Sequence, residues 1–271
     1  NSVTFIGDNA FGGMKNLADP IKFESYPYNT IPKCYTLLDV DAMEDAGISQ
    51  VQNYPRLELQ GSGVLIGFVD TGIDYQNPVF RNLDGSSRIV GIWDQTVQEG
   101  VPPRGMLYGS EYRKDVIDEA LRLEDPLTRV PSIDTVSHGT FLASIAAGGA
   151  SEEQQFLGAA PDAMIAMVKL KPAKNYLLRY YNIRQSLEIY QENDIMLGIK
   201  YLIGLAEEKR LPLVISIALG TNFGGHNGTI PLSVLLNQYA FLPNCVVVTG
   251  VGNESNKRHH YQGKINSMQD K

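Results

Sequence analysis

The sequence has few cysteines, no long apolar run and no run of basic residues, and each of these shortages limits the classes of protein to which it can belong. It has two cysteines, Cys34 and Cys245, so a disulfide is possible but not required, and the redox compartment is left open. It has no run of about 18 apolar residues, which a transmembrane helix would need. It has no run of Lys or Arg, and its net charge is −7. We therefore expect no membrane span and no nucleic-acid partner.

The amino terminus also lacks familiar features. The start, Asn-Ser-Val-Thr-Phe, has neither a methionine nor the charged segment of a signal peptide. We therefore expect an expressed or processed fragment of a longer protein. What is present is the balance of an ordinary globular protein, with 43% hydrophobic and 20% charged residues, which is enough to form a sizeable core.

Strands and helices alternate from Gly61 onward, whereas residues 1–60 are irregular apart from a helical stretch at 41–46. Apolar runs typical of buried strands occur at 64–69, 88–93, 163–170, 213–219 and 245–249. Cys245 opens the last run, so we expect it to be a buried free thiol. Helices are predicted at 111–123, within a polar insertion at about 97–134, and at 138–147, 193–209 and about 231–242.

Polar residues predict where the later helices begin. Asn193 or Asp194 would cap the long helix, and Thr229 would cap the last one, with Pro231 in its first turn. The alternation of strands and helices predicts an α/β fold with a mostly parallel sheet and helices on both faces. In such sheets the functional site lies at the carboxyl ends of the strands.

Asp70 stands at the carboxyl end of the first predicted strand, in the segment Asp70-Thr-Gly-Ile. A partly buried carboxylate held there by backbone donors is well placed to orient a histidine. The alternative is that Asp70 only caps the following turn. The triplet Asp-Thr-Gly also marks aspartic proteases, but those need two copies in one site and this chain has one.

His138 opens the predicted small-residue helix in the segment His138-Gly-Thr. A histidine at a helix start projects its ring from the end of the element, and Gly139 permits close approach of another backbone. Farther on, Gly250 and Gly252 follow the last predicted strand and leave a flat wall for a substrate. The Asn253 side chain can donate to a developing oxyanion, although, taken by itself, Asn253 is better explained by a left-handed turn.

Taken together, these segments resemble the subtilases, the subtilisin-like serine proteases of peptidase family S8. Asp70-Thr-Gly-Ile, His138-Gly-Thr and Gly252-Asn253-Glu agree with the family in type and order, and so do Leu157-Gly-Ala-Ala-Pro and the strand Val214 to Gly220. The resemblance covers about residues 61–255. The run from Asp74 to Asn82, the segment Ile92 to Thr96 and the polar insertion are similar to the clostridial germination-protease branch.

The resemblance implies a three-layer subtilisin-like fold that is incomplete at its carboxyl end. Residues 61–271 would form the incomplete catalytic domain, and residues 1–60 an extension or propeptide remnant packed on the core. Asp70 would orient and stabilise the imidazolium, His138 would act as general base and acid, and Asn253 would donate to the oxyanion. An extended peptide or protein substrate would contact Ala218, Leu219, Gly220, Gly250 and Gly252, and the protein's own propeptide is a further partner.

One family feature is not found. Subtilases carry their nucleophile in a Gly-Thr-Ser segment after the oxyanion asparagine, and Ser255 and Ser267 lack that context. The first hypothesis is therefore a serine endopeptidase whose serine lies downstream, with the present chain inactive by itself. The second is a pseudoprotease that binds or senses. We expect no cofactor, and no metal site is predicted because the histidines His226, His259 and His260 have no supporting ligand spacing.

Overall fold

The computed structural model describes residues 46–55, 57, 59–151, 156–183, 188–221 and 227–250. All of them belong to one compact unit, residues 38–255. The predicted helix at 41–46 lies outside the described residues except for Ala46, which is in a turn. The first described helix is α2 (Ile48–Gln52), and Gln52 donates hydrogen bonds to the carbonyl oxygens of Gly158 and Ala159.

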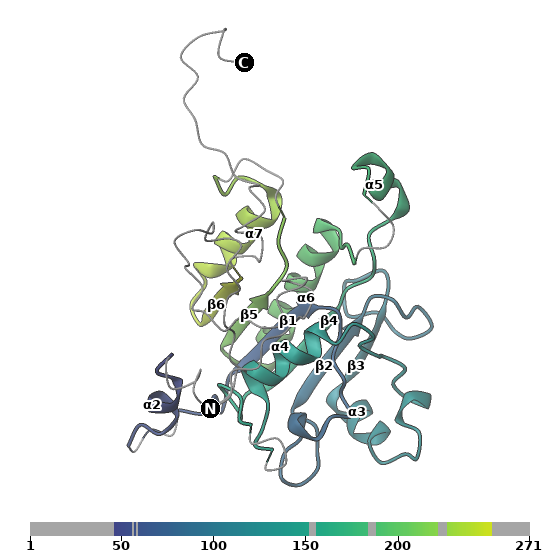
Figure 1. Ribbon diagram of the computed structural model, residues 1–271. Coiled ribbons are helices and arrows are strands. Elements are labelled where there is room, and N and C mark those ends of the chain that lie inside the picture. Colours follow the sequence, from purple (N-terminus) through teal and green to yellow (C-terminus); the bar gives the residue numbers. More distant parts are fainter. Residues whose placement is uncertain are drawn as a thin grey trace, which may run out of the picture. The chain divides into compact units, whose positions relative to one another are not determined.

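A six-stranded sheet forms the middle of this unit (Figure 1). Its strands are β1 (Leu65–Asp70), β2 (Ile89–Asp94), β3 (Ser110–Arg113), β4 (Met164–Lys169), β5 (Leu213–Ile217) and β6 (Cys245–Thr249). The order across the sheet is β3-β2-β4-β1-β5-β6, and only β3 runs antiparallel to its neighbour. The predicted mostly parallel sheet is therefore confirmed, and the parallel strands place their carboxyl ends along one edge.

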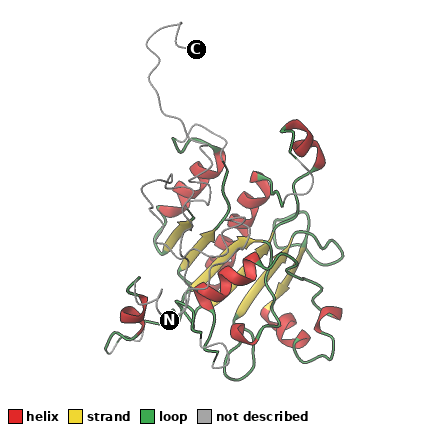
Figure 2. Ribbon diagram, viewed as in Figure 1, coloured by secondary structure: helices red, strands yellow, loops and turns green. Residues whose placement is uncertain are grey.

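Helices cover both faces of the sheet, as Figure 2 shows. The longer elements are α3 (Lys114–Ala120), α4 (His138–Ala147), α6 (Glu192–Lys209) and α7 (Pro231–Ala240), and the shorter ones are η3 (Pro78–Phe80), η4 (Pro126–Thr128) and α5 (Asn175–Tyr180). Apolar residues of α6 and α7 share one core cluster with the sheet, and those of α3 and α4 share the other. The result is a three-layer arrangement with a core on each side of the sheet.

The two faces of β1 explain how the layers are built. Every residue of β1 is buried, as predicted for a strand covered on both sides. Leu65 and Val69 belong to the cluster on the α6 face, whereas Ile66 and Phe68 belong to the cluster on the α4 face. Because side chains alternate along a strand, Asp70 points to the same face as Ile66 and Phe68, which is the face that α4 covers.

The polar insertion differs from its prediction. Residues 111–123 were expected to form one helix, but 110–113 form β3 and the helix α3 covers only 114–120. Tyr112 pairs with Ile92 of β2 and enters the core from a strand. Pairing with β2 therefore overrides the local helical pattern, which is a common outcome when a short segment meets a sheet edge.

Four further predictions are wrong in detail. The long helix begins after Gln191 instead of Asn193 or Asp194, and the last helix begins after Ile230 instead of Thr229, without a side-chain cap in either case. The strand β6 is not buried: Val246 and Val248 are about half exposed, at 54% and 50%. Cys245 is a free thiol as expected, but it is only partly buried.

Candidate active site

The candidate site lies at the carboxyl end of β1, where Asp70 is the last strand residue and only 1% exposed. Its Oδ1 atom accepts a hydrogen bond of 2.7 Å from the backbone N–H of Thr71. The same Oδ1 lies 2.8 Å from Nδ1 of His138. An ionised carboxylate can only accept, so this contact places the imidazole proton on Nδ1 and leaves Nε2 free to accept a proton.

His138 occupies the first position of α4, so its ring extends from the end of the helix toward Asp70. Its side chain is 46% exposed, whereas that of Asp70 is 2% exposed. The pair therefore combines a buried carboxylate with an imidazole that solvent or a ligand can reach. The other oxygen of Asp70, Oδ2, is buried without a hydrogen-bond partner among the described residues, which is uncommon away from sites with a chemical role.

Two glycines allow the helix to come this close to β1. A Cβ atom on Gly139 would lie 2.2 Å from the carbonyl oxygen of Gly72 and 3.2 Å from Cβ of Asp70. The close approach predicted for Gly139 is thus confirmed. Gly72 has φ of 129°, a conformation that favours glycine, and it turns the chain immediately after the strand.

Asp134 joins the turn after β1 to the start of α4. Its Oδ1 accepts from the Thr71 hydroxyl at 2.9 Å and from the N–H groups of Val136 and Ser137 at 3.2 and 2.9 Å. Its Oδ2 accepts from the N–H and the hydroxyl of Thr140 at 2.9 and 2.6 Å. Burial raises the pKa of Asp134, but these hydrogen bonds outweigh it and hold the pKa below its ordinary value.

The segment that leads to His138 is also tied to the sheet upstream of Asp134. The hydroxyl of Tyr75 donates to the carbonyl oxygen of Val130 at 3.0 Å. The Ser132 hydroxyl donates to Oδ2 of Asp94 at 2.7 Å, and Nζ of Lys169 lies 3.3 Å from the same oxygen. Asp94 and Lys169 are the last residues of β2 and β4, so the segment is fastened at the edge where β1 ends.

The predicted substrate-contacting residues are only partly described. Ala218, Leu219 and Gly220 follow β5, and Gly250 follows β6, so all four lie at the carboxyl edge of the sheet. The N–H of Gly250 donates to the carbonyl oxygen of Ile217 at 3.3 Å. Gly252 and Asn253 lie outside the described residues, as do His226, His259 and His260.

Comparison with known protein families gives a match over most of the chain. The profile of the subtilase family, Peptidase_S8, matches residues 61–268, which is most of the chain. The chain belongs to the subtilase family. A comparison with curated protein sequences found no match.

Solved structures of proteases resemble this subtilase. The structure of the Clostridium perfringens CspB protease has a TM-score of 0.68 and 36% sequence identity, and the match covers 80% of this chain and 41% of that one. Lower similarity is found to two other proteases. The S41 psychrophilic protease has 18% sequence identity and a TM-score of 0.48, and the match covers 77% of this chain and 52% of that one. Sphericase has 20% identity and a TM-score of 0.47, and the match covers 77% of this chain and 53% of that one. The subtilase chain thus spans less than half the length of the CspB chain. The predicted similarity to clostridial proteases agrees with the CspB match.

Several residues at or near the candidate site of this subtilase were not predicted from the sequence. Asp134 stands four residues before His138, and Thr71 directly follows Asp70, so their positions relative to the two motifs were the available signals. Tyr190 lacks such a signal. Burial raises the pKa of Tyr190, and the negative charges of Glu188, Asp70 and Asp134 raise it further.

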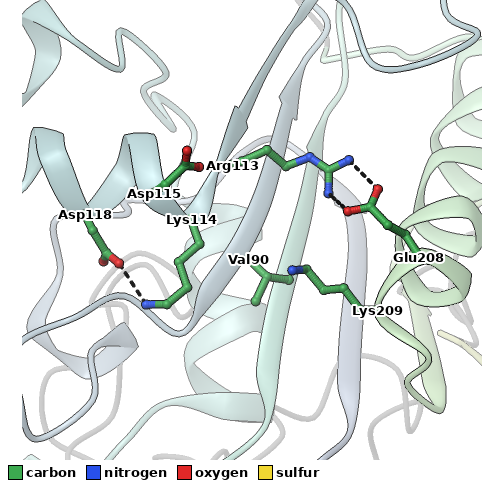
Figure 3. A pocket seen from close by; sticks show the side chains of 7 residues that line it. All are labelled: Val90, Arg113, Lys114, Asp115, Asp118, Glu208 and Lys209. Carbon is green, nitrogen blue, oxygen red and sulfur yellow. Dashed lines mark hydrogen bonds and ion pairs between the residues drawn. The ribbon is translucent and has the colours of Figure 1, made fainter.

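A separate pocket of about 630 Å³ lies away from this edge (Figure 3). Val90, near the start of β2, lines it, and so do Glu208 and Lys209 at the end of α6, which places it near the amino ends of the strands. Two of its cations are paired, Arg113 with Glu208 and Lys114 with Asp118. The pocket contains no histidine or hydroxyl nucleophile, so its lining does not suggest catalysis.

In the part of the chain that the structure describes, no group of three or more His, Cys, Asp or Glu side chains is arranged to hold a metal ion. None of the described helices is both long enough and apolar enough to cross a bilayer.

Proposed function

We propose that this subtilase is a serine endopeptidase, and that the present chain contributes the aspartate and the histidine of its Ser-His-Asp triad. The 2.8 Å contact between Asp70 Oδ1 and His138 Nδ1 is the observation that carries the proposal. It joins the two residues through the nitrogen that a triad requires, at the carboxyl edge of the sheet. Membership of a protease family and similarity to the CspB protease support the same reaction class.

In the proposed reaction, His138 Nε2 takes the proton of the serine hydroxyl while the serine oxygen attacks the scissile carbonyl carbon. His138 then gives that proton to the leaving amine. Asp70 holds the ring in the required tautomer and stabilises the imidazolium. Asn253 is proposed as the side-chain donor to the oxyanion, a role in which the loss of one donor typically costs about 3 kcal/mol of transition-state stabilisation.

The nucleophile is proposed to be a serine that follows Lys271 in the complete protein. The chain from Asn1 to Lys271 would then be inactive alone. An extended peptide would lie along Ala218 to Gly220 on one side and Gly250 to Gly252 on the other, with main-chain hydrogen bonds giving affinity and pockets giving specificity. The protein's own propeptide is a further proposed partner.

Labelling with a fluorophosphonate, which reacts with activated serines, tests this function. We expect the longer protein to be labelled and chain 1–271 to remain unlabelled. The His138→Ala substitution should abolish labelling of the longer protein, and Asp70→Asn should slow it by about 10⁴-fold, because the imidazole then favours the wrong tautomer.

The matched control is Asp84→Asn, since the Asp84 carboxylate is exposed and its hydrogen bonds, from Ser86 and its own backbone, stay within a local turn. Labelling of this variant should equal that of the unaltered protein. Absence of labelling in the unaltered longer protein would instead favour the pseudoprotease, which keeps the fold and binds peptides without cleaving them. Labelling that persists in His138→Ala would exclude His138 as the base.

A further inference from the structure

We propose that Asp134 is a positioning residue, whose ionised carboxylate sets the geometry of the His138–Asp70 hydrogen bond. The inference rests on the proposed roles of His138 and Asp70. In the described contacts, Asp134 makes no hydrogen bond to the side chain of His138 or to that of Asp70. Asp134 acts through Thr71, which directly follows Asp70, and Thr140, which is the second residue after His138.

The first connection runs through Thr71. Its hydroxyl donates to Asp134 Oδ1 at 2.9 Å and accepts from the N–H of Gly139 at 2.9 Å. The backbone N–H of the same residue donates to Asp70 Oδ1 at 2.7 Å. One threonine thus contacts Asp134, the carboxylate of Asp70 and the residue next to His138. Its hydroxyl proton goes to Asp134, and one of its lone pairs accepts from Gly139.

The second connection runs through Thr140. Its hydroxyl donates to Asp134 Oδ2 at 2.6 Å and accepts from the N–H of Asp74 at 2.9 Å. The N–H of Thr140 donates to the same carboxylate oxygen. Asp134 therefore holds the first turn of α4 against the segment that follows Asp70 at Gly139 and Thr140, the two residues after His138.

The start of α4 depends on this carboxylate for its own hydrogen bonds. Ser137, at the N-cap position, has φ of 67° and makes no side-chain cap of its own. Its N–H and that of Thr140 donate to Asp134, and that of Gly139 donates to Thr71. A helix start needs acceptors for its free N–H groups, and here side chains outside the helix supply them.

A carboxylate is needed because five donors converge on it, and three of them are backbone N–H groups, which can never accept. The other two are the hydroxyls of Thr71 and Thr140, which donate to Asp134 while accepting from Gly139 and Asp74. The Asp134→Asn substitution places an NH₂ group where one oxygen stood. That NH₂ group would then face backbone donors, either the N–H groups of Val136 and Ser137 or the N–H of Thr140, and the start of α4 would move away from it.

The test is NMR of chain 1–271 labelled with ¹⁵N-histidine, which contains four histidines. The Nδ1 proton of His138, hydrogen-bonded to Asp70, should give a resonance far downfield at low temperature. We expect Asp134→Asn to stay folded, by circular dichroism, and to lose this resonance or shift it upfield. Asp84→Asn, an exposed aspartate in a local turn, is the control and should leave the resonance unchanged.

A folded Asp134→Asn protein with an unaltered resonance would overturn the positioning role and leave the proposed function standing. Absence of the resonance in the unaltered chain would instead count against the His138–Asp70 pair itself, and so against both proposals. If Asp134→Asn does not fold, Thr71→Val takes its place, because it removes the connecting hydroxyl and keeps the side-chain shape. The resonance should disappear in Thr71→Val and return in Thr71→Ser; its persistence in folded Thr71→Val overturns the inference.

The longer protein provides a second measurement. In a peptidase assay, Asp134→Asn should lower kcat by about 10- to 100-fold and change KM little, since displacing a catalytic group by about 1 Å slows the chemical step. If kcat/KM fell by the same factor only because KM rose, with kcat unchanged, a role in positioning His138 would be contradicted.

Discussion

At the scale of single residues, the candidate site depends on a glycine, Gly139, at a position where no side chain would fit. Gly139 follows the proposed base, and its α-carbon faces the carbonyl oxygen of Gly72 so closely that a Cβ would lie 2.2 Å from it. That oxygen belongs to the backbone and cannot rotate away. Any larger residue would therefore push α4 away from β1, and the 2.8 Å contact between His138 and Asp70 would lengthen.

The Gly139→Ala substitution should lower the free energy of unfolding by about 3 kcal/mol, because relief of the clash requires a backbone shift. Urea denaturation of chain 1–271 measures this. Gly204→Ala is the matched control: Gly204 lies within α6, and a Cβ there would meet nothing within 4 Å. Since alanine is the better helix former, Gly204→Ala should raise stability by about 0.5–1 kcal/mol. Equal effects at the two positions would contradict the packing argument.

At the scale of elements, α4 is fixed at both ends by side chains from elsewhere. Asp134 and Thr71 satisfy its start, as described above, and Arg88 satisfies its end. Arg88 is 6% exposed, and its guanidinium donates to the carbonyl oxygens of Ala147 at 2.6 Å, Val79 at 2.6 Å and Ala163 at 2.9 Å. Burial lowers the pKa of Arg88, yet the position retains a cation at a helix carboxyl end, where it is favourable.

Replacement of Arg88 by methionine should cost about 3 kcal/mol, because the buried carbonyl oxygens of Ala147 and Ala163 lose a charged donor. Arg88→Lys should recover only part of this loss, since a single ammonium does not have the forked geometry of a guanidinium. Thermal or urea unfolding gives the comparison. Arg104→Met, at an exposed position, should change stability by no more than about 0.5 kcal/mol. A similarly small change in Arg88→Met would show that these hydrogen bonds do not stabilise the fold.

At the scale of the whole molecule, buried phenols set how the fold responds to alkali. Burial is the largest cause of the raised pKa of Tyr75, Tyr108, Tyr190 and Tyr201, and nearby carboxylates add to it in each case. For Tyr75 the pKa rises to about 12. A raised pKa in the folded state stabilises the protein fully below the unfolded pKa of about 10, and this stabilisation is lost as the pH rises above it.

We therefore expect the free energy of unfolding to fall as the pH is raised from about 9 to about 11, because the unfolded chain loses phenolic protons that the folded chain keeps. Tyr75→Phe should be less stable than the unaltered chain near neutral pH by about 1 kcal/mol, since Val130 loses a donor, but should decline less steeply with pH. Urea denaturation at a series of pH values tests this. Tyr180→Phe, at a 79% exposed position, should keep the steep decline. A slope unchanged in Tyr75→Phe would contradict the burial effect.

The sequence by itself determined the elements whose patterns are local. Apolar runs predicted β1, β2, β4, β5 and β6 to within about two residues, and the small-residue run predicted α4 from His138 to Ala147 as observed. A strand that ends at Asp70 and a helix that starts at His138 are each specified by the residues within them. Since parallel strands end at one edge, the sequence also predicted which edge carries the site.

Only the tertiary structure decided what depends on residues far apart in the chain. Asp70 and His138 are 68 positions apart, and they meet because the alternation along β1 turns Asp70 toward the face that α4 covers. Pairing with β2 made β3 a strand in place of part of a predicted helix, and the position of β6 at the end of the sheet left Val246 and Val248 exposed. The acceptors for the start of α4 come from Asp134 and Thr71, outside the helix. Local periodicity cannot encode such contacts, because they exist only when distant segments pack together.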